Sequence, residues 1–146
     1  MPTRTARTAW NGSLQTGSGQ VELTSSKAGT FDVSFPKRAA DDAGGTTSPE
    51  ELIAAAHTAC FAMQLSANIA EEGGTPHSLE VSAEVGLGPD PERGGFVLTG
   101  ITLTVVGEVD GLDESGFQKA AQAAKQGCPV SKALTGVDIT LEASLA

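Results

Sequence analysis

The chain contains only two cysteines, Cys60 and Cys128, and they are its first candidates for chemistry. A thiolate is a nucleophile, whereas a thiol in an apolar interior has a raised pKa and is inert. Cys60 lies in an Ala-rich apolar segment, so its position alone favours the second reading, a small hydrophobic core residue. Reactivity at Cys60 would need a fixed positive charge, brought to it from elsewhere in the fold.

Arg38 is the most interesting source of that charge, because it follows a predicted strand and shortly precedes a predicted helix. Its guanidinium is always charged and carries a fork of donors, which Glu50 at the helix start could hold in place. Glu50 and Cys60 are ten residues apart, which at about 100° per residue brings them within about 80° of one helix face. The alternative is that Glu50 only complements the helix dipole, worth about 0.3–1 kcal/mol, and that Arg38 is solvated.

Cys128 has a different setting. It precedes Pro129 at a predicted helix start, where free N–H groups and the helix dipole favour a thiolate. The alternative is a small residue that occupies a cap position without a function. Because Cys60 and Cys128 are 68 positions apart (128 − 60), this is not a CxxC motif, and only the fold could bring the two together.

His57 and Cys60 stand three residues apart on one helix face and form a possible pair of metal ligands. A zinc site needs three or four ligands, and the sequence offers no further close cluster. We therefore expect His57 to be a helix histidine that hydrogen-bonds locally, and we predict no metal site.

The central element of the chain is a helix predicted from Pro49 to Glu72, about 36 Å long at about 1.5 Å per residue. Ser48 is a preferred N-cap, Pro49 fits the first helical position, and Glu51 completes a capping box with Ser48. Gly73 and Gly74 are suited to end the helix. The helix is apolar on nearly every face, which predicts burial on all sides. One sheet cannot provide that cover in so short a chain, so we predict a homodimer with these helices at its core.

The remaining pattern predicts strands in runs separated by helices. Three short strands are expected between Thr5 and Pro36, with a hairpin turn at Asn11-Gly12. Residues 14–16 are expected to be extended, and the third strand is expected to alternate through Phe31, Val33 and Phe35. The other expected elements are strands 79–87, 96–109 and 137–145 and helices 113–126 and 129–134. The intervening 37–47 segment, before the central helix, is expected to be a loop. The order β-β-β-α-β-β-α-(α)-β indicates a single α+β domain over residues 1–146 with mainly antiparallel sheets wrapped around the long buried helix.

Composition excludes several functional classes. The 146 residues carry a formal charge of −9, so binding to nucleic acid or to an anionic membrane surface is not expected. The N-terminus has no apolar signal-peptide core, and polar residues interrupt the central helix, which argues against a membrane span. We expect a cytoplasmic protein, in which two cysteines are thiols or a redox pair rather than a structural staple.

Two segments carry a specific family resemblance: GTTSPEELIAAAHTACFAMQLS from Gly45 to Ser66, and GCPVSKAL from Gly127 to Leu134. They resemble the OsmC/Ohr family of thiol-dependent hydroperoxide reductases, and AAHTACF and GCPVSKAL look like the OsmC branch more than the Ohr branch. The resemblance covers nearly the whole chain in element order. It implies an intertwined homodimer with two active sites at the subunit interface.

The resemblance also implies a role for four residues. Cys60 would be the peroxidatic cysteine, Cys128 the resolving cysteine, and Arg38 and Glu50 an ion pair beside Cys60. The substrates implied are organic hydroperoxides and, second, hydrogen peroxide, with a role in oxidative or osmotic stress defence. An external thiol or dithiol would be required, but no metal, flavin or haem. The alternatives are a thiol-based redox sensor and a non-catalytic ligand-binding dimer.

Overall fold

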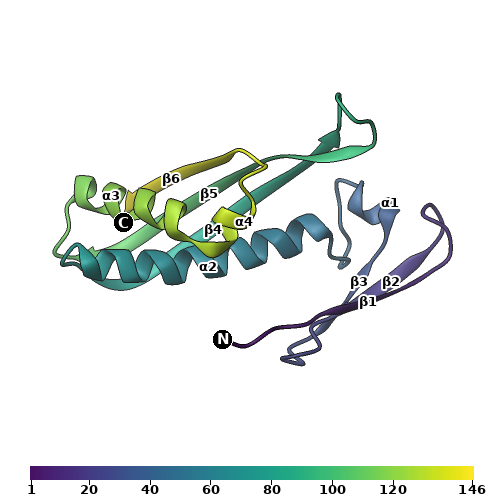
Figure 1. Ribbon diagram of the computed structural model, residues 1–146, viewed down its shortest axis with the longest axis horizontal. Helices are drawn as coiled ribbons and strands as arrows, with labels where there is room; N and C mark the ends of the chain where they lie inside the picture. The colour runs from purple at the N-terminus through teal and green to yellow at the C-terminus, as the bar shows by residue number, and fades with distance from the viewer. The chain divides into compact units, whose positions relative to one another are not determined.

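The computed structural model describes residues 1–146, which divide into two compact units, Met1–Leu52 and Ile53–Ala146. The first unit contains β1 (Arg7–Asn11), β2 (Ser18–Glu22), β3 (Thr30–Val33), α1 (Phe35–Arg38) and the first residues of α2 (Pro49–Glu71). The second contains the rest of α2, then β4 (Thr75–Pro89), β5 (Phe96–Asp110), α3 (Glu114–Gly127), α4 (Pro129–Ala133) and β6 (Ile139–Leu145). Figure 1 shows α2 as the longest helix, and it belongs to both units.

The first unit is built on an antiparallel sheet in the order β1-β2-β3. The predicted two-residue turn at Asn11-Gly12 is wrong: Asn11 pairs with Ser18, and residues 12–17 connect the strands. Within this longer loop the hydroxyls of Ser13 and Thr16 lie 2.7 Å apart. The segment 14–16, expected to be extended, is therefore part of the turn.

A second correction concerns the end of the third strand. The strand was expected to reach Phe35, but β3 ends at Val33 and Phe35 begins α1. Ser34 is extended and its hydroxyl accepts from the Lys37 N–H at 3.3 Å, which caps the helix. Pro36 fits the first turn, where its missing N–H is no loss. A short helix therefore occupies the start of the segment predicted to be a loop, and it carries Arg38 at its last position.

In the second unit two helices pack on one face of the sheet β4-β5-β6 (Figure 1). Strands β4 and β5 are antiparallel, whereas β6 runs parallel to β5 from Ile101↔Ile139 to Gly107↔Leu145. Alternate β5 residues enter the core, as the period-two pattern predicts. The fully or nearly fully buried core side chains are Phe61, Leu65 and Ile69 of α2, Ile101, Leu103 and Val105 of β5, and Phe117, Ala120, Ala121 and Ala124 of α3.

The ends of α2 follow from local hydrogen bonds. At its start the Ser48 hydroxyl accepts from the Glu51 N–H at 3.1 Å, as predicted. The other half of the predicted capping box differs, because the Glu51 carboxylate accepts instead from the Thr47 hydroxyl at 2.7 Å. At the other end, Gly73 adopts φ +87° and the Gly74 N–H donates to the Ile69 carbonyl at 2.9 Å. This is a Schellman ending, which favours glycine at the left-handed position.

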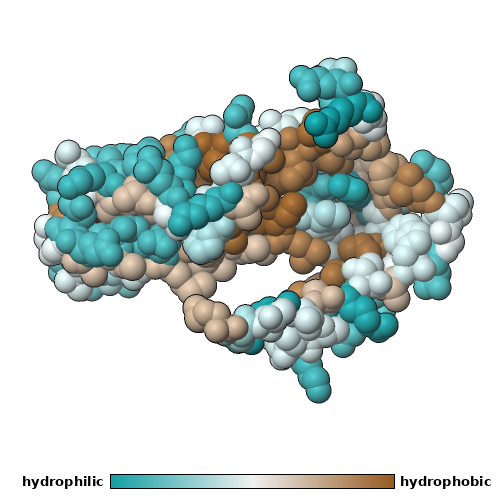
Figure 2. Space-filling model, in the orientation of Figure 1, coloured by the Kyte–Doolittle hydropathy of each residue, from teal (hydrophilic) through white to brown (hydrophobic).

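In the single chain α2 is buried along one face only, as expected of a helix that one sheet cannot cover. One row is fully buried, comprising His57, Phe61, Leu65 and Ile69, while the opposite face, with Ala55, Ala59, Met63 and Ala67, is exposed. By length and composition alone α2 could cross a membrane, a test that core helices also pass. Figure 2 shows that hydrophobic residues gather on the surface of the single chain rather than being scattered over it. The predicted α+β class with mainly antiparallel sheets and a long central helix is confirmed.

Candidate functional site

Arg38 and Glu50 form an ion pair within the first unit. The Arg38 Nε lies 3.1 Å from both carboxylate oxygens of Glu50, and Nη2 lies 2.6 Å from Oε1. The Arg38 side chain is 29% exposed and that of Glu50 only 10%. Burial raises the pKa of Glu50, but the hydrogen bond and charge of Arg38 outweigh it, so the pKa falls below its ordinary value. The pair is therefore charged at neutral pH, and Glu50 restrains the arginine fork.

An apolar pocket of about 360 Å³ lies beside this ion pair, also within the first unit. Arg38 supplies the only charged group on its wall. The other lining residues are Thr8, Trp10, Leu14, Val21, Val33, Ser34, Phe35, Thr47, Pro49 and Leu52. A pocket with apolar walls and one cation suits a small molecule that has an apolar body and a polar or developing negative end.

Cys60 and Cys128 meet within the second unit. Their sulfur atoms lie 2.9 Å apart, and both are free thiols. A disulfide bond would need about 2.05 Å, so the sulfurs are at hydrogen-bonding rather than bonding distance. Cys60 is partly exposed and Cys128 is fully buried. The structure thus brings together two cysteines that are 68 residues apart.

Two helix ends place Cys128. Its backbone N–H donates to the Ala124 carbonyl at 2.8 Å, which closes α3, and Cys128 is also the N-cap residue of α4. Because Pro129 follows it, Cys128 avoids the helical region and adopts φ −60°, ψ 122°. The prediction of Cys128 at the cap position with Pro129 in the first turn is confirmed. Gly127 is instead the last residue of α3, not the residue beyond it as expected.

The two sulfurs have opposite pKa shifts. Burial, followed by the hydrogen bond to Cys128, raises the pKa of Cys60. Burial also raises the pKa of Cys128, but the Cys60 hydrogen bond and the polar groups of Ser131 and Val130 outweigh it and lower the pKa. The Cys128 side chain makes no regular capping hydrogen bond. The Ser131 and Val130 groups therefore act on the Cys128 sulfur mainly as dipoles at the start of α4. Cys128 is therefore the more readily ionised of the two thiols.

A shallow hollow of about 410 Å³ opens beside the partly exposed Cys60 sulfur. Its wall is mostly apolar and lies along the uncovered face of α2. The lining residues are Ala56, Ala59, Cys60, Met63, Gln64, Ala67 and Pro129. This hollow gives a small molecule access to Cys60 but not directly to Cys128, which is buried behind it.

Sequence reasoning missed the contact of His57. His57 is fully buried, and its Nε2 lies 2.7 Å from the Ser131 Oγ, 74 residues away, so the expectation of a local hydrogen bond is wrong. Burial lowers the pKa of His57, which keeps the ring neutral. The one available signal was the position of Ser131, three residues after Cys128 in the first turn of α4. No group of three or more His, Cys, Asp or Glu side chains is arranged to hold a metal ion.

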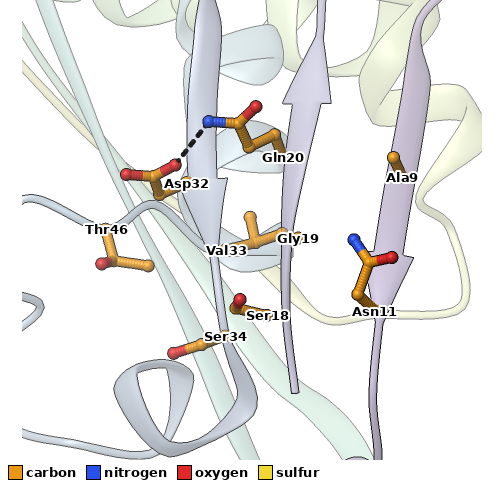
Figure 3. Close-up of a pocket in the computed structure, with 9 residues that line it drawn as sticks. All are labelled: Ala9, Asn11, Ser18, Gly19, Gln20, Asp32, Val33, Ser34 and Thr46. Atoms are coloured by element: carbon orange, nitrogen blue, oxygen red, sulfur yellow. Dashed lines mark hydrogen bonds between the residues drawn. The ribbon is translucent and has the colours of Figure 1, made fainter.

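A more polar hollow of about 500 Å³ lies on the sheet of the first unit, and Figure 3 shows the side chains around it. Its one charged group, Asp32, accepts a hydrogen bond from Gln20 at 3.0 Å. The figure shows no sulfur, cation or histidine among the lining side chains. This hollow contains none of the predicted site residues, and neither cysteine lines it.

The chain is similar to known proteins over most of its length. The OsmC-like protein family model matches residues 41–142. The chain is 41% identical to Peroxiredoxin OsmC of Escherichia coli over 136 residues, which are 93% of this chain and 92% of that protein. It is 37% identical to the organic hydroperoxide resistance protein OhrB of Bacillus subtilis over 113 residues, which are 77% of this chain and 79% of that protein.

Solved structures extend the likeness to the fold. The crystal structure of OhrB from Bacillus subtilis matches with a TM-score of 0.75 and 33% identity, covering 96% of this chain and 98% of that one. An organic hydroperoxide resistance protein OsmC from Legionella pneumophila matches with a TM-score of 0.78 and 29% identity, covering 99% and 98%. The family-model match and the identity to full-length relatives together show that this chain belongs to the OsmC family.

Proposed function

We propose that this protein is a cysteine-dependent peroxidase that reduces organic hydroperoxides, with Cys60 as the nucleophile and Cys128 as the resolving cysteine. The observation that carries the proposal is the 2.9 Å approach of the two sulfurs, one partly exposed and the other buried behind it. The names of the relatives, a peroxiredoxin and organic hydroperoxide resistance proteins, support the reaction class.

The proposed reaction has three steps. The Cys60 thiolate attacks one peroxide oxygen, an S–O bond forms, the O–O bond breaks, and the leaving oxygen takes a proton to give an alcohol or water. Cys128 then condenses with the Cys60 sulfenic acid, which forms the disulfide and releases water. An external thiol or dithiol reduces the disulfide by exchange. The cycle needs no metal, flavin or haem.

Arg38 has the role of activating Cys60 in this proposal. The residues of the second unit raise the pKa of Cys60, so a thiolate there requires a cation that this unit does not itself place on the sulfur. Arg38 is the arginine whose fork is already held by a buried carboxylate, Glu50, on the same helix as Cys60. We infer that Arg38 lowers the pKa of Cys60 and orients the peroxide.

The substrate preference follows from the apolar walls. The pocket beside Arg38 contains Trp10, Leu14 and Phe35, and the hollow beside Cys60 contains Met63 and alanines. An alkyl or aryl group gains binding energy from burial against such walls, which hydrogen peroxide cannot do. We therefore propose organic hydroperoxides as preferred substrates, with hydrogen peroxide as a poorer one.

The uncovered face of α2 supports a homodimer. Met63 is 71% exposed in the single chain, and the neighbouring alanines of that face are exposed as well. A contiguous apolar face of this kind on a soluble chain marks an interaction surface. We propose a second copy as its cover, with two active sites at the interface, in a cytoplasmic protein that serves stress defence.

Turnover distinguishes this function from the alternative of a redox sensor, which the same cysteine pair would also serve. The test is a panel of cumene, tert-butyl, lipid and hydrogen peroxides, each with several thiol and dithiol reductants. We expect multiple turnovers that are fastest with an organic peroxide and a dithiol. Oxidation of one disulfide per chain without further peroxide consumption would favour the sensor and contradict the enzyme. No oxidation of either cysteine would leave the non-catalytic ligand-binding dimer.

A further inference from the structure

His57 occupies an unusual position for a polar side chain. It is 0% exposed, its Nδ1 has no hydrogen-bond partner, and its one polar contact is Nε2 to the Ser131 Oγ at 2.7 Å. A buried polar atom left unpaired is costly, because it has lost its hydrogen bonds to water and gained none in the protein. Because Nδ1 is already enclosed within the single chain, a partner subunit does not reach it. Such a costly arrangement needs an explanation.

Ser131 lies in the first turn of α4, whose N-cap residue is Cys128, so the contact with Ser131 ties His57 to the helix start that places Cys128. Ser131 is one of the groups that lower the pKa of Cys128, through both its backbone N–H and its hydroxyl. A serine hydroxyl has one proton to donate. When that proton is directed at the Cys128 sulfur, the Ser131 oxygen is free to accept, and His57 has to be the donor through Nε2–H. Nδ1 is then an unpaired acceptor rather than an unpaired donor, the less costly of the two cases.

We propose that His57 and Ser131 are positioning residues for Cys128, an assignment that rests on the proposed function. His57 Nε2–H donates to the Ser131 oxygen and turns the hydroxyl proton towards the Cys128 sulfur, which favours the Cys128 thiolate once Cys60 has become the sulfenic acid. The Cys128 thiolate then attacks the sulfur of the Cys60 sulfenic acid. An S–S bond forms, the S–O bond breaks, and the departing hydroxide takes up the proton that Cys128 released on ionising.

The surroundings of Cys128 leave this task to few groups. Helix α2 contributes Cys60, which contacts Cys128, and His57, which contacts Ser131. Helix α4 contributes the polar groups of Ser131 and Val130. Strand β5 contributes only apolar side chains to the same core, Ile101, Leu103 and Val105. Lys125 near the end of α3 and Lys132 on α4 are the flanking charged residues. Neither lysine takes part in the proposed His57–Ser131–Cys128 relay, so the effect of the relay is separable from both charges by mutation.

The first test measures ionisation without any peroxide chemistry. Cys60→Ser leaves Cys128 as the only thiol, and its thiolate absorbance is titrated with pH, in a chain that has no tyrosine to interfere. We expect the apparent pKa of Cys128 to rise in Ser131→Ala and in His57→Leu. His57→Gln, which can place an amide N–H near the position of Nε2, should restore it towards the parent value. An unchanged pKa in both Ser131→Ala and His57→Leu overturns the proposal.

The second test measures the resolving step in the two-cysteine protein. After one equivalent of peroxide, disulfide formation near neutral pH should slow about tenfold in Ser131→Ala, the scale of a lost hydrogen bond to a charged group. Raising the pH should recover the rate, and His57→Gln should stay close to wild type. Equal rates at neutral pH would contradict the proposal. If the Cys128 pKa shifts as expected but no variant, nor the wild type, consumes peroxide, the positioning role stands and the peroxidase function fails.

Discussion

Two side-chain pairs, one in each unit of the molecule, differ in how the chain assembles them. Arg38 and Glu50 are 12 residues apart, at the end of one helix and the start of the next, and are joined by three N–H···O contacts. Cys60 and Cys128 are 68 residues apart and meet only where α2 packs against the α3–α4 corner. The first pair fixes the position of the Arg38 charge through residues that are close in the sequence. The second is the proposed redox couple, and its members meet only through the tertiary packing.

The difference between the pairs separates two tasks. The Arg38 charge is held by a partner of opposite sign, Glu50, and the lowered pKa of Glu50 keeps that partner ionised at neutral pH. A redox couple has to approach and yet remain unbonded in the reduced state, which an apolar core with two helix ends can arrange. Variants that remove one member of each pair therefore test the division directly.

The largest effect is expected from Cys60→Ser, which removes the proposed nucleophile. Peroxide consumption with a dithiol should fall at least about a thousandfold, because a serine hydroxyl lacks thiolate nucleophilicity. Cys128→Ser is the contrast, since it should retain a single turnover measured by rapid mixing with cumene hydroperoxide. Equal rates for wild type and Cys60→Ser would remove the cysteine pair from the chemistry.

The next largest effect should come from Arg38→Ala. We expect kcat/KM for an organic peroxide to fall about a hundredfold, the scale of a lost electrostatic group, together with a rise in the Cys60 pKa measured by pH-dependent alkylation. Arg38→Lys, which keeps the charge but not the fork, should be intermediate. The matched control is Lys37→Ala, which removes a neighbouring charge from the same short helix. If Lys37→Ala had the larger effect, the assignment of Arg38 would be wrong.

Cys128→Ser should have a smaller effect on turnover and a distinct product. Steady-state turnover with a dithiol should fall about tenfold, because Cys60 sulfenic acid then has to be reduced directly by the external thiol. Repeated peroxide should convert Cys60 to sulfinic acid, which intact-mass spectrometry detects. This variant has only one cysteine and cannot form an intramolecular disulfide. Full resistance of Cys60 to over-oxidation would therefore be the result that contradicts a resolving role for Cys128.

The smallest effect concerns stability against acid. Burial depresses the pKa of His57, so only the unfolded chain takes up a proton as pH falls below about 6.5, and stability falls with it. The depressed pKa of Glu50 gives a contribution that is present above its ordinary value of 4.5 and is lost as pH falls below it. The Tm of thermal unfolding should first fall by about 2–4 °C as the pH is lowered, and His57→Gln should remove this decrease. A second decrease in Tm at lower pH should be removed by Glu50→Gln.

His77 provides the control for that experiment. It lies on the surface with its Nε2 2.7 Å from the Asp110 Oδ2, and this hydrogen bond raises its pKa. The raised pKa gives a contribution that is present at acid pH and lost as pH rises, the opposite sign to that of His57. His77→Gln should therefore leave the acid-side loss in place. A loss that disappears in His77→Gln but persists in His57→Gln would reverse the assignment.

Features with a short-range cause were predictable from the chain. The Ser48 cap, the glycine ending of α2 and the extended Cys128 before Pro129 all depend on neighbouring residues. Short-range predictions failed where a competing local hydrogen bond was overlooked, as where the Glu51 carboxylate accepts from Thr47 instead of completing the capping box. The Ser13–Thr16 contact lengthened the first turn, and the Ser34 cap converted the expected strand end at Phe35 into a helix.

Features with a long-range cause were not predictable from spacing or periodicity. The parallel pairing of β6 with β5 and the 74-residue contact between His57 and Ser131 are examples. The sequence by itself determined which residues could react, which caps would place them and that α2 would be apolar all round. Only the tertiary structure decided that Cys60 and Cys128 meet and that His57 is buried against Ser131. Such contacts close long loops, and only the packing of the whole core repays the entropy they cost.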